Sequence, residues 1–396
     1  MTAWIQTSLL TELSELIASR RDAMLALTRK LVEAESPSGD VEGSRFVVKL
    51  LIEAAAEIPM LKSAERVTSP DYGEHLRRSY FEQSASARSQ TLILGHTDTV
   101  HPRGTILERP WRSEGERIFG PGIFDMKANC ALALEAIRAR AALGGAHPTN
   151  GDAVTLLLTC DEEDGSATGR ALVEEEARRA ARVLVLEPSA PGGRAKTGRK
   201  GTGAWTLRAH GLAAHAGLDP EKGASAILEI ARQIERLHAL NDFSRGTTIN
   251  VGVVRGGTTS NVIAAEAEAE IDVRYTTAAE AARLTAVLAN LRPIDDRVQL
   301  TMEGAINRPP LERSAAVVEL FNEARRIAHA LGFELGEAQV GGASDGNFAA
   351  SLCPAVLDGL GIEGDGAHAR HEHIITTHIP ARGAMIAALL SNSSAE

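Results

Sequence analysis

Four apolar runs, each followed closely by polar side chains, constrain the fold of this chain most. The runs are TLILG at 91–95, AVTLLLTC at 153–160, VLVL at 183–186 and AVL at 355–357. Continuous apolar runs of this length are typical of parallel strands that are covered on both faces. Helical periodicity appears in the segments 8–34, 41–57 and 126–143, whereas 71–90 is polar and is expected to form a surface loop. We therefore expect an α/β domain with a central, mostly parallel sheet.

Side chains that suit metal binding follow these runs. His96 and Asp98 come after the first run, the acidic stretch 161–164 (DEED) after the second, Glu187 after the third and His368 a little beyond the fourth. In open α/β sheets, sites form outside the carboxyl ends of the strands. The sequence therefore predicts that these groups converge on one edge of the sheet.

The acidic stretch DEED is informative because of its charge. Four adjacent carboxylates that leave a buried strand repel one another, and a buried charge without compensation costs several kcal/mol. Alone, DEED would be read as a solvated loop, but further imidazoles and carboxylates at the same edge favour a bound cation. Imidazole together with carboxylate suits zinc, with manganese or cobalt as alternatives.

The segment 204–303 follows a different pattern. Its expected elements are a strand at 204–210, a helix at 222–240, strands at 247–255 and 266–275, a helix at 279–291 and a strand at 297–303. This βαββαβ order is that of the ferredoxin-like fold. We predict a small α+β domain, 204–309, inserted into the larger α/β domain formed by 1–203 and 310–396.

Charge and cysteine content limit the partners and the compartment. The formal charge is −10 at pH 7, which argues against nucleic acid or an anionic membrane as the main partner. The N-terminal residues lack a basic stretch followed by an apolar one, so no signal peptide is expected, and no apolar run approaches a membrane span. The three widely spaced cysteines suggest reduced core residues in a cytoplasmic protein.

Five motifs in order carry a family resemblance: GHTDTV, GPGIFDMKA, TCDEEDGS, VLVLEPS and GDGAHARHEHI. They resemble the metal-site motifs of the co-catalytic zinc peptidases, the family of carboxypeptidase G, aminoacylase, acetylornithine deacetylase and succinyl-diaminopimelate desuccinylase. The motifs look closest to the glutamate carboxypeptidase branch. The resemblance spans nearly the whole chain, including the inserted domain, and implies two zinc ions per chain.

The resemblance also implies ligands and catalytic roles. One zinc would be held by His96, Asp125 and Glu187, and the other by Asp125, Glu163 and His368. A shared Asp125 is reasonable because one carboxylate has two oxygens and co-catalytic metals lie about 3.5–4 Å apart. Asp98 would orient His96. Glu162 would be the general base toward a water that bridges the metals.

Further roles are implied for the inserted domain, which would act as a lid. His215 in GLAAHAG would stabilise the oxyanion, in dimeric relatives at the partner's active site. Asn261 in RGGTTSNVIA, Arg274 in DVRY and Arg308 in INRPP stand where relatives bind substrate. An arginine fork suits a carboxylate, although Arg274 would also fit a solvated strand face. We expect a homodimer formed through this domain.

The expected reaction is hydrolysis of an amide or peptide bond that releases an amino acid, with glutamate as the favoured product. The substrate would be an N-acyl amino acid or a short peptide. An aminoacylase, another N-deacetylase or a dipeptidase remains open, because the same metals and base cut these bonds. A non-catalytic binding protein is disfavoured because it has no use for the base Glu162. We expect His371 and His373 at the surface, and His101, His210 and His329 in structural positions.

Overall fold

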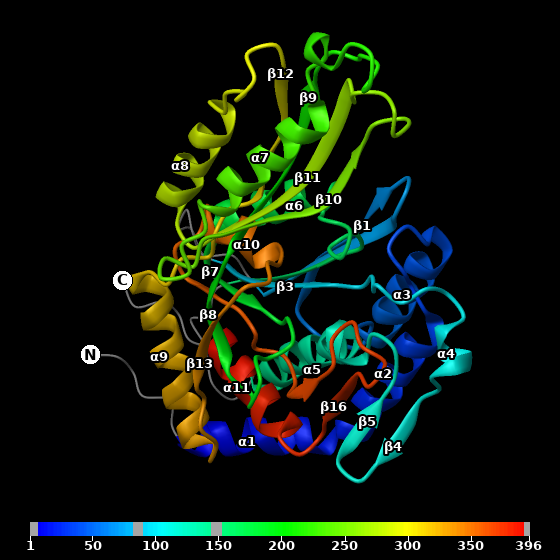
Figure 1. The fold of residues 1–396 in the computed structure, drawn as a ribbon. Helices are drawn as coiled ribbons and strands as arrows, with labels where there is room; N and C mark the ends of the chain where they lie inside the picture. Colours follow the sequence, from blue (N-terminus) through cyan, green and yellow to red (C-terminus); the bar gives the residue numbers. More distant parts are fainter. Residues whose placement is uncertain (1–6, 82–89, 144–152, 392–396) are drawn as a thin grey trace. The chain divides into compact units, whose positions relative to one another are not determined.

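The computed structural model describes residues 7–81, 90–143 and 153–391 (Figure 1). Its contacts divide the chain into two compact units. Unit 1 comprises Met1–Gly198, Arg313–Val340 and Ser344–Glu396, and unit 2 comprises Arg199–Glu312 and Gly341–Ala343. Each unit has a sheet and an apolar core of its own.

The central sheet of unit 1 has the strand order β1-β2-β6-β3-β7-β14. The strands are β1 (Leu61–Ser69), β2 (Gly73–Tyr80), β3 (Gln90–His96), β6 (Ala153–Thr159), β7 (Ala180–Val185) and β14 (Val356–Leu357). Strands β6, β3, β7 and β14 are parallel, whereas β1 and β2 join antiparallel. The α/β class and the mostly parallel sheet are thus confirmed.

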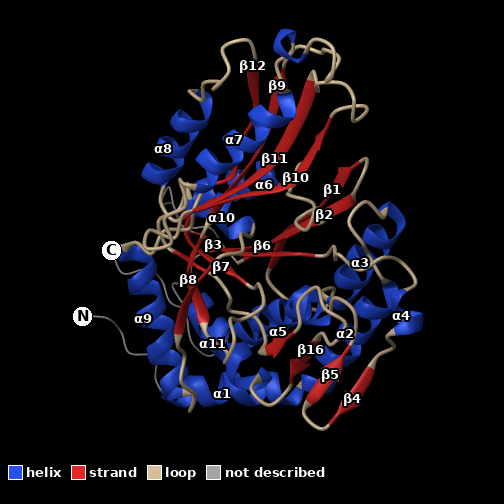
Figure 2. Ribbon diagram, in the orientation of Figure 1, coloured by secondary structure: helices blue, strands red, loops and turns tan. Residues whose placement is uncertain are grey.

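Helices surround this sheet, and small sheets lie beside it (Figure 2). The helices of unit 1 are α1 (Thr7–Ser19), α2 (Arg21–Ala34), α3 (Val41–Ala54), α4 (Thr105–Glu108), α5 (Ala128–Leu143), α6 (Arg170–Arg179), α9 (Ala315–Ala330), α10 (Asp345–Ala350) and α11 (Ile379–Ser391). The small sheets are β15 (Gly364–Asp365), β16 (His373–Ile375), β5 (Arg117–Phe119) and β4 (Arg112–Glu114) in that order, and β13 (Glu337–Val340) with β8 (Ala195–Arg199). The periodic segment 8–34 is two helices, α1 and α2, which meet at Arg20.

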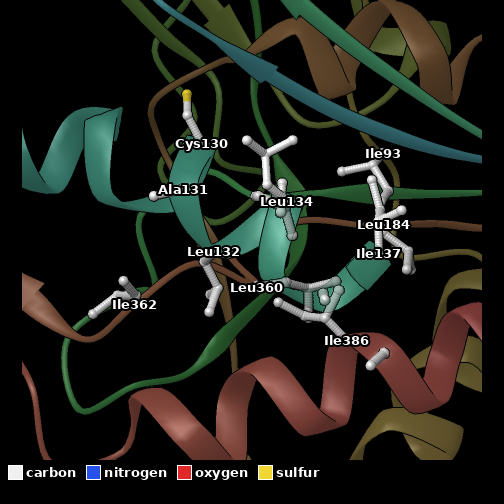
Figure 3. Close-up of a cluster of buried hydrophobic side chains, with 14 of the residues drawn as sticks. Ile93, Cys130, Ala131, Leu132, Leu134, Ile137, Leu184, Leu360, Ile362 and Ile386 are labelled. Atoms are coloured by element: carbon white, nitrogen blue, oxygen red, sulfur yellow. The ribbon is translucent and has the colours of Figure 1, made fainter. Parts of the chain in front are cut away.

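Both faces of the parallel strands are buried, which explains their continuous apolar sequences. Figure 3 shows Ile93 of β3 and Leu184 of β7 beside Leu134 and Ile137 of α5, within the main core. Neighbouring residues such as Leu92 point to the opposite face, because side chains alternate along a strand, and they are buried as well. Helix α6 contacts β3 and β7.

The prediction of a surface loop at 71–90 is wrong for its first half. Residues 73–80 form β2, in which Leu76 and Tyr80 are fully buried. The sequence of this strand is polar, but the strand can be buried because its charged side chains are compensated. Arg78 donates to the hydroxyl of Tyr80 at 2.9 Å, and Arg66 of β1 donates to Glu74 at 2.6 Å. The segment 82–89 lies outside the described residues.

Unit 2 has the βαββαβ order that its sequence predicts. Its elements are β9 (Gly201–His210), α7 (Ala226–His238), β10 (Thr248–Gly256), β11 (Glu266–Tyr275), α8 (Ala278–Ala289) and β12 (Gln299–Arg308). The strands pair antiparallel in the order β10-β11-β9-β12. Alternate residues of β11 are buried against the helices, where Ile271 shares a core with Ile230 of α7 and Leu284 of α8. The other face of β11 carries the acidic residues.

Two further features are the burial of the cysteines and the length and composition of the described helices. Cys130, Cys160 and Cys353 are all buried, as expected for core residues. None of the described helices has both the length and the apolar character needed to span a membrane.

Candidate metal centre

The parallel strands of unit 1 deliver several polar side chains to one edge of the sheet. His96 is the last residue of β3, Glu162 and Glu163 follow β6, and Glu187 follows β7. Asp125 lies in a turn, Ile123–Lys127, that leads into α5. His368 lies in the loop between β15 and β16 with a φ of 63°. The convergence that the sequence predicts for the strand ends is observed.

Asp125 contacts both histidines through different oxygens. Its Oδ1 lies 3.2 Å from Nε2 of His96, and its Oδ2 lies 3.4 Å from Nε2 of His368. Glu187 lies 3.4 Å from the same nitrogen of His96, and Glu163 lies 3.1 Å from that of His368. The side chains therefore form two overlapping groups around Asp125, one at His96 and one at His368, and ligand atoms of His96, Asp125 and Glu163 also lie within 4.8 Å of one another.

Glu162 lies at the edge of the same cluster. A carboxylate oxygen of Glu162 and ligand atoms of His96 and Glu187 all lie within 4.8 Å of one another. The main-chain N–H of Glu162 donates to Asp98 at 3.2 Å. Its side chain is half-buried, in contrast to the fully buried His96. A carboxylate in this position is within reach of both a bound cation and solvent.

Asp98 holds the centre together in two ways. His96 donates from Nδ1 to the main-chain carbonyl of Asp98 at 3.0 Å, whereas the nearest carboxylate oxygen lies 3.4 Å away. The carboxylate instead accepts the N–H groups of Glu162 and Glu163 and the hydroxyl of Ser38, the last at 2.7 Å. Asp98 thereby directs Nε2 of His96 toward Asp125 and fixes the loop after β6.

The electrostatics of the described centre call for cations. Its carboxylates are those of Asp98, Asp125, Glu162, Glu163 and Glu187, and its imidazoles are those of His96 and His368. Even with both imidazoles protonated, the formal count is 5 − 2 = 3 negative charges in excess. One oxygen of Glu163, Oε1, is buried without a hydrogen-bond partner among the described residues. Two divalent cations would neutralise the excess and satisfy that oxygen, so the residues fit a pair of metal ions.

The pKa values of His96, His368 and Glu163 are shifted, and these shifts reflect the same excess of negative charge. Burial opposes the charge on His96, but the neighbouring carboxylates of Asp125, Asp98 and Glu187 raise the pKa of its imidazole well above the usual value. Hydrogen bonds to Asp125 and Glu163 raise the pKa of His368 to about 10. Burial raises the pKa of Glu163. The carboxylates thus attract positive charge strongly, which protons supply when no metal is bound.

Several buried charged residues around the centre were not predicted from the sequence. Lys127 is fully buried and donates from Nζ to the carbonyl of Thr97 at 2.6 Å and to Ser36, and burial lowers the pKa of Lys127 to about 8. Glu372 is also buried and contacts the turn that carries Asp125. Both residues lie within the motifs that carry the family resemblance, DMKA for Lys127 and HARHEHI for Glu372, and that position was the available signal.

The surface position expected for His373 is wrong. His371 is exposed, but His373 is buried, donates from Nδ1 to the carbonyl of His371 at 2.9 Å and packs against the ring of Phe119. Its strand, β16, pairs with β5 and turns the side chain inward. His101 is buried and contacts Glu372.

Unit 2 places its four predicted site residues at the two ends of its sheet, two at each end. The N–H of Ala216, next to His215, donates to the carbonyl of Asn261 at 2.9 Å. At the other end of β9, Arg274 and Arg308 both lie opposite Thr202, one on each neighbouring strand. The strand from Thr202 to His210 spans about 26 Å at ~3.3 Å per residue, so the two pairs lie at opposite ends of this sheet.

The side chains of these residues differ in their surroundings. Nδ1 of His215 accepts the N–H groups of Gly217 and Leu218, both at 3.1 Å, so a neutral imidazole carries its proton on Nε2. Arg274 lies on the acidic face of β11 and forms an ion pair with Asp272 at 2.9 Å. Arg308 is buried.

The imidazoles and carboxylates gathered at the carboxyl ends of the parallel strands form a candidate metal site. Comparison with known proteins makes the assignment specific. The model for peptidase family M20/M25/M40 matches residues 92–392, and the chain belongs to this family. The protein is therefore a hydrolase that acts on peptide or amide bonds, and the family resemblance seen in its motifs is confirmed.

Individual relatives resemble the chain over most of its length. Carboxypeptidase G2 of Pseudomonas sp. is 28% identical over 94% of this chain and 90% of its own length. A succinyl-diaminopimelate desuccinylase of Methylibium petroleiphilum is 30% identical over 90% of this chain and 94% of its own. Among solved structures, aminopeptidase PepT of Bacillus cereus superimposes with a TM-score of 0.77 at 21% identity, covering 94% of this chain and 98% of its own.

Proposed function

We propose that this protein is a metal-dependent carboxypeptidase-like amidohydrolase that releases a C-terminal amino acid, with glutamate favoured, from an N-acyl amino acid or short peptide. The observation that supports this most strongly is the pair of imidazole–carboxylate groups that share Asp125. The similarity to carboxypeptidase G2 over nearly the full length supports the choice of substrate class.

The proposed metal ligands follow from these two groups. His96, Asp125 and Glu187 would hold one ion, and Asp125, Glu163 and His368 the other. Zinc suits this mixture of imidazole and carboxylate, and manganese or cobalt would also fit. When bound, such ions polarise the scissile carbonyl and lower the pKa of water.

Within this proposal, Glu162 is the general base. It takes a proton from the attacking water and passes it to the leaving nitrogen, which converts a poor leaving group into an amine. The N–H bond to Asp98 supports this role because it holds Glu162 at the edge of the cluster. Asp98 would keep His96 and the loop after β6 in place. A protein that only bound its ligand would have no need for a base here.

We further propose that His215 donates from Nε2–H to the oxyanion of the transition state. The tautomer set by Gly217 and Leu218 supports this role, because it leaves the proton on the outer nitrogen. Asn261, beside it, would contact the same substrate.

The two ends of the unit 2 sheet bear on how the site is assembled. We propose that Arg274 and Arg308 bind a substrate carboxylate, because a guanidinium fork matches one. An N-acyl amino acid is much shorter than the distance of about 26 Å along β9. One substrate therefore cannot contact both His215 with Asn261 and Arg274 with Arg308 of the same copy of unit 2. This supports a homodimer in which His215 and Asn261 serve the partner's active site.

A mixed dimer tests this arrangement. Chains with His215→Ala and chains with Glu162→Gln should each form homodimers with strongly reduced activity, His215→Ala by about 10²–10³-fold in kcat. A heterodimer should regain one working site, because intact Glu162 of one chain meets intact His215 of the other. Activity would be measured on tagged, purified heterodimers. Heterodimers no more active than the sum of their homodimers would contradict the crossing of His215.

The product of the reaction distinguishes the proposed substrate from its alternatives. The similarity to succinyl-diaminopimelate desuccinylase favours N-deacylation of an amino acid as the second candidate, and a dipeptidase uses the same groups. Mass spectrometry of products from a panel of N-acyl amino acids and dipeptides should show preferential release of glutamate, abolished by a chelator. Preferential release of another amino acid would replace the carboxypeptidase assignment by aminoacylase or dipeptidase.

A further inference from the structure

Glu372 is a buried carboxylate in the loop that carries His368. It lies four residues after His368, directly before β16, and is only 2% exposed. Its negative charge is enclosed in unit 1 but does not belong to either group of proposed metal ligands. A carboxylate buried to this extent must be compensated by hydrogen-bond donors.

The donors to Glu372 come mainly from the turn that carries Asp125. Oε1 accepts the N–H of Phe124 at 2.9 Å and the N–H of Asp125 itself at 3.0 Å. Oε2 accepts the N–H of Gly122 at 2.8 Å. Asp125 has φ −117° and ψ 91°, which are not helical values, so this turn requires partners other than those of a regular helix.

A second set of bonds fixes Glu372 from the other side. His101 lies 2.6 Å from Oε2 through Nε2, and Arg109 donates from Nη2 to Nδ1 of His101 at 3.1 Å. Because arginine only donates, Nδ1 must accept and Nε2–H must donate to the carboxylate. Arg109 also donates to the carbonyl of Ala369, the residue after His368, so these hydrogen bonds connect Glu372 to the His368 loop as well.

We infer that Glu372 is a positioning residue that sets the place of the shared ligand Asp125 relative to His368. One carboxylate spans the two loops, binding the Asp125 turn through three N–H groups while its own backbone continues from His368. His101 and Arg109 hold that carboxylate in a single orientation. This inference rests on the proposed function, because it requires metal ions at the ligands described above.

The substitution Glu372→Gln tests the inference with little change in shape. The new amide group must point a donor either at the N–H groups of Phe124 and Asp125 or at those of Gly122 and His101. We expect Zn²⁺ affinity to fall by about 10–100-fold, as for other residues that orient metal ligands. Affinity would be measured by competition with a chromophoric chelator, and the absorption spectrum of the Co²⁺-loaded protein should shift.

A matched control separates positioning from general stability. Glu135 is another buried carboxylate of unit 1, paired with Arg20 and Arg138, so Glu135→Gln should lower the unfolding temperature without changing Zn²⁺ affinity. His101→Ala, which keeps the three main-chain bonds, should weaken Zn²⁺ binding less than Glu372→Gln. It also provides the test if the latter does not fold.

The outcomes are distinct. Weaker binding in Glu372→Gln and His101→Ala, with normal binding in Glu135→Gln, supports the inference. Normal Zn²⁺ affinity in the folded Glu372 and His101 variants, or an equal loss in Glu135→Gln, overturns it and leaves the proposed function intact. A wild-type protein that binds no divalent metal overturns both.

Discussion

Replacing Glu162 by glutamine should lower kcat by about 10²–10⁴-fold, the range supplied by a general base, while the protein keeps both metal ions. Glutamine has nearly the same shape as glutamate but cannot accept a proton at neutral pH. The proposed ligands remain unchanged; they are His96, Asp125, Glu163, Glu187 and His368. The measurement is kcat on the preferred N-acyl amino acid, together with metal content by elemental mass spectrometry on the same samples.

Asp164 provides a control from the same acidic loop. It is exposed and forms a hydrogen bond with Tyr72, and no catalytic role is proposed for it. Asp164→Asn should therefore retain nearly full turnover. Full turnover in Glu162→Gln with both ions bound would remove Glu162 from the role of base. Loss of metal in that variant would instead assign Glu162 as a ligand, as its nearness to His96 and Glu187 allows.

Removing the shared carboxylate should have the largest effect on metal content. In Asp125→Ala both histidines lose their common partner, since each of its oxygens contacts a different one. We expect this variant to lose both ions on dialysis and to lose all detectable turnover. The measurement is the number of ions per chain after dialysis against metal-free buffer.

Two single-site variants complete this comparison. Glu187→Gln and Glu163→Gln each change a proposed ligand of only one ion, so each should weaken the binding of that ion and leave the other ion bound. The graded loss, from both ions to one, follows from the sharing of Asp125. Retention of two ions by Asp125→Ala, or equal losses in all three variants, would contradict a shared ligand.

The strand ends could be predicted from sequence because burial on both faces leaves an unmistakable apolar run. Once β3, β6 and β7 were taken as parallel, the residues that follow them had to meet at one edge. Asp125 and His368 were different, because both lie in irregular turns. His368 could still be assigned to this edge because it comes after the fourth apolar run, whereas only the family resemblance indicated that Asp125 would be shared by two metal ions.

Errors arose where charged residues are compensated in three dimensions. Strand β2 carries glutamate, histidine and arginine, and pairings such as Arg78 with Tyr80 allow it to lie inside the sheet. The loop 368–373 looked like surface for the same reason, although Glu372 and His373 are buried. Hydropathy alone cannot distinguish such residues from solvated ones, because the partners come from distant parts of the sequence.

The register of unit 2 was also inaccessible from sequence. The order of its elements followed from periodicity, but the position of Arg274 and Arg308 opposite Thr202 depends on how the strands are aligned. That alignment separates the arginines from His215, which is the observation behind the proposed homodimer.

The central claim is that two bound metal ions drive the hydrolysis of an amide bond. The most direct measurement is a titration of chelator-stripped protein with Zn²⁺, following amino-acid release from an N-acyl glutamate by mass spectrometry. We predict no release without metal and a rise that reaches its plateau at two ions per chain. Release that persists in the stripped protein, or that is indifferent to added Zn²⁺, Mn²⁺ and Co²⁺, would contradict the account.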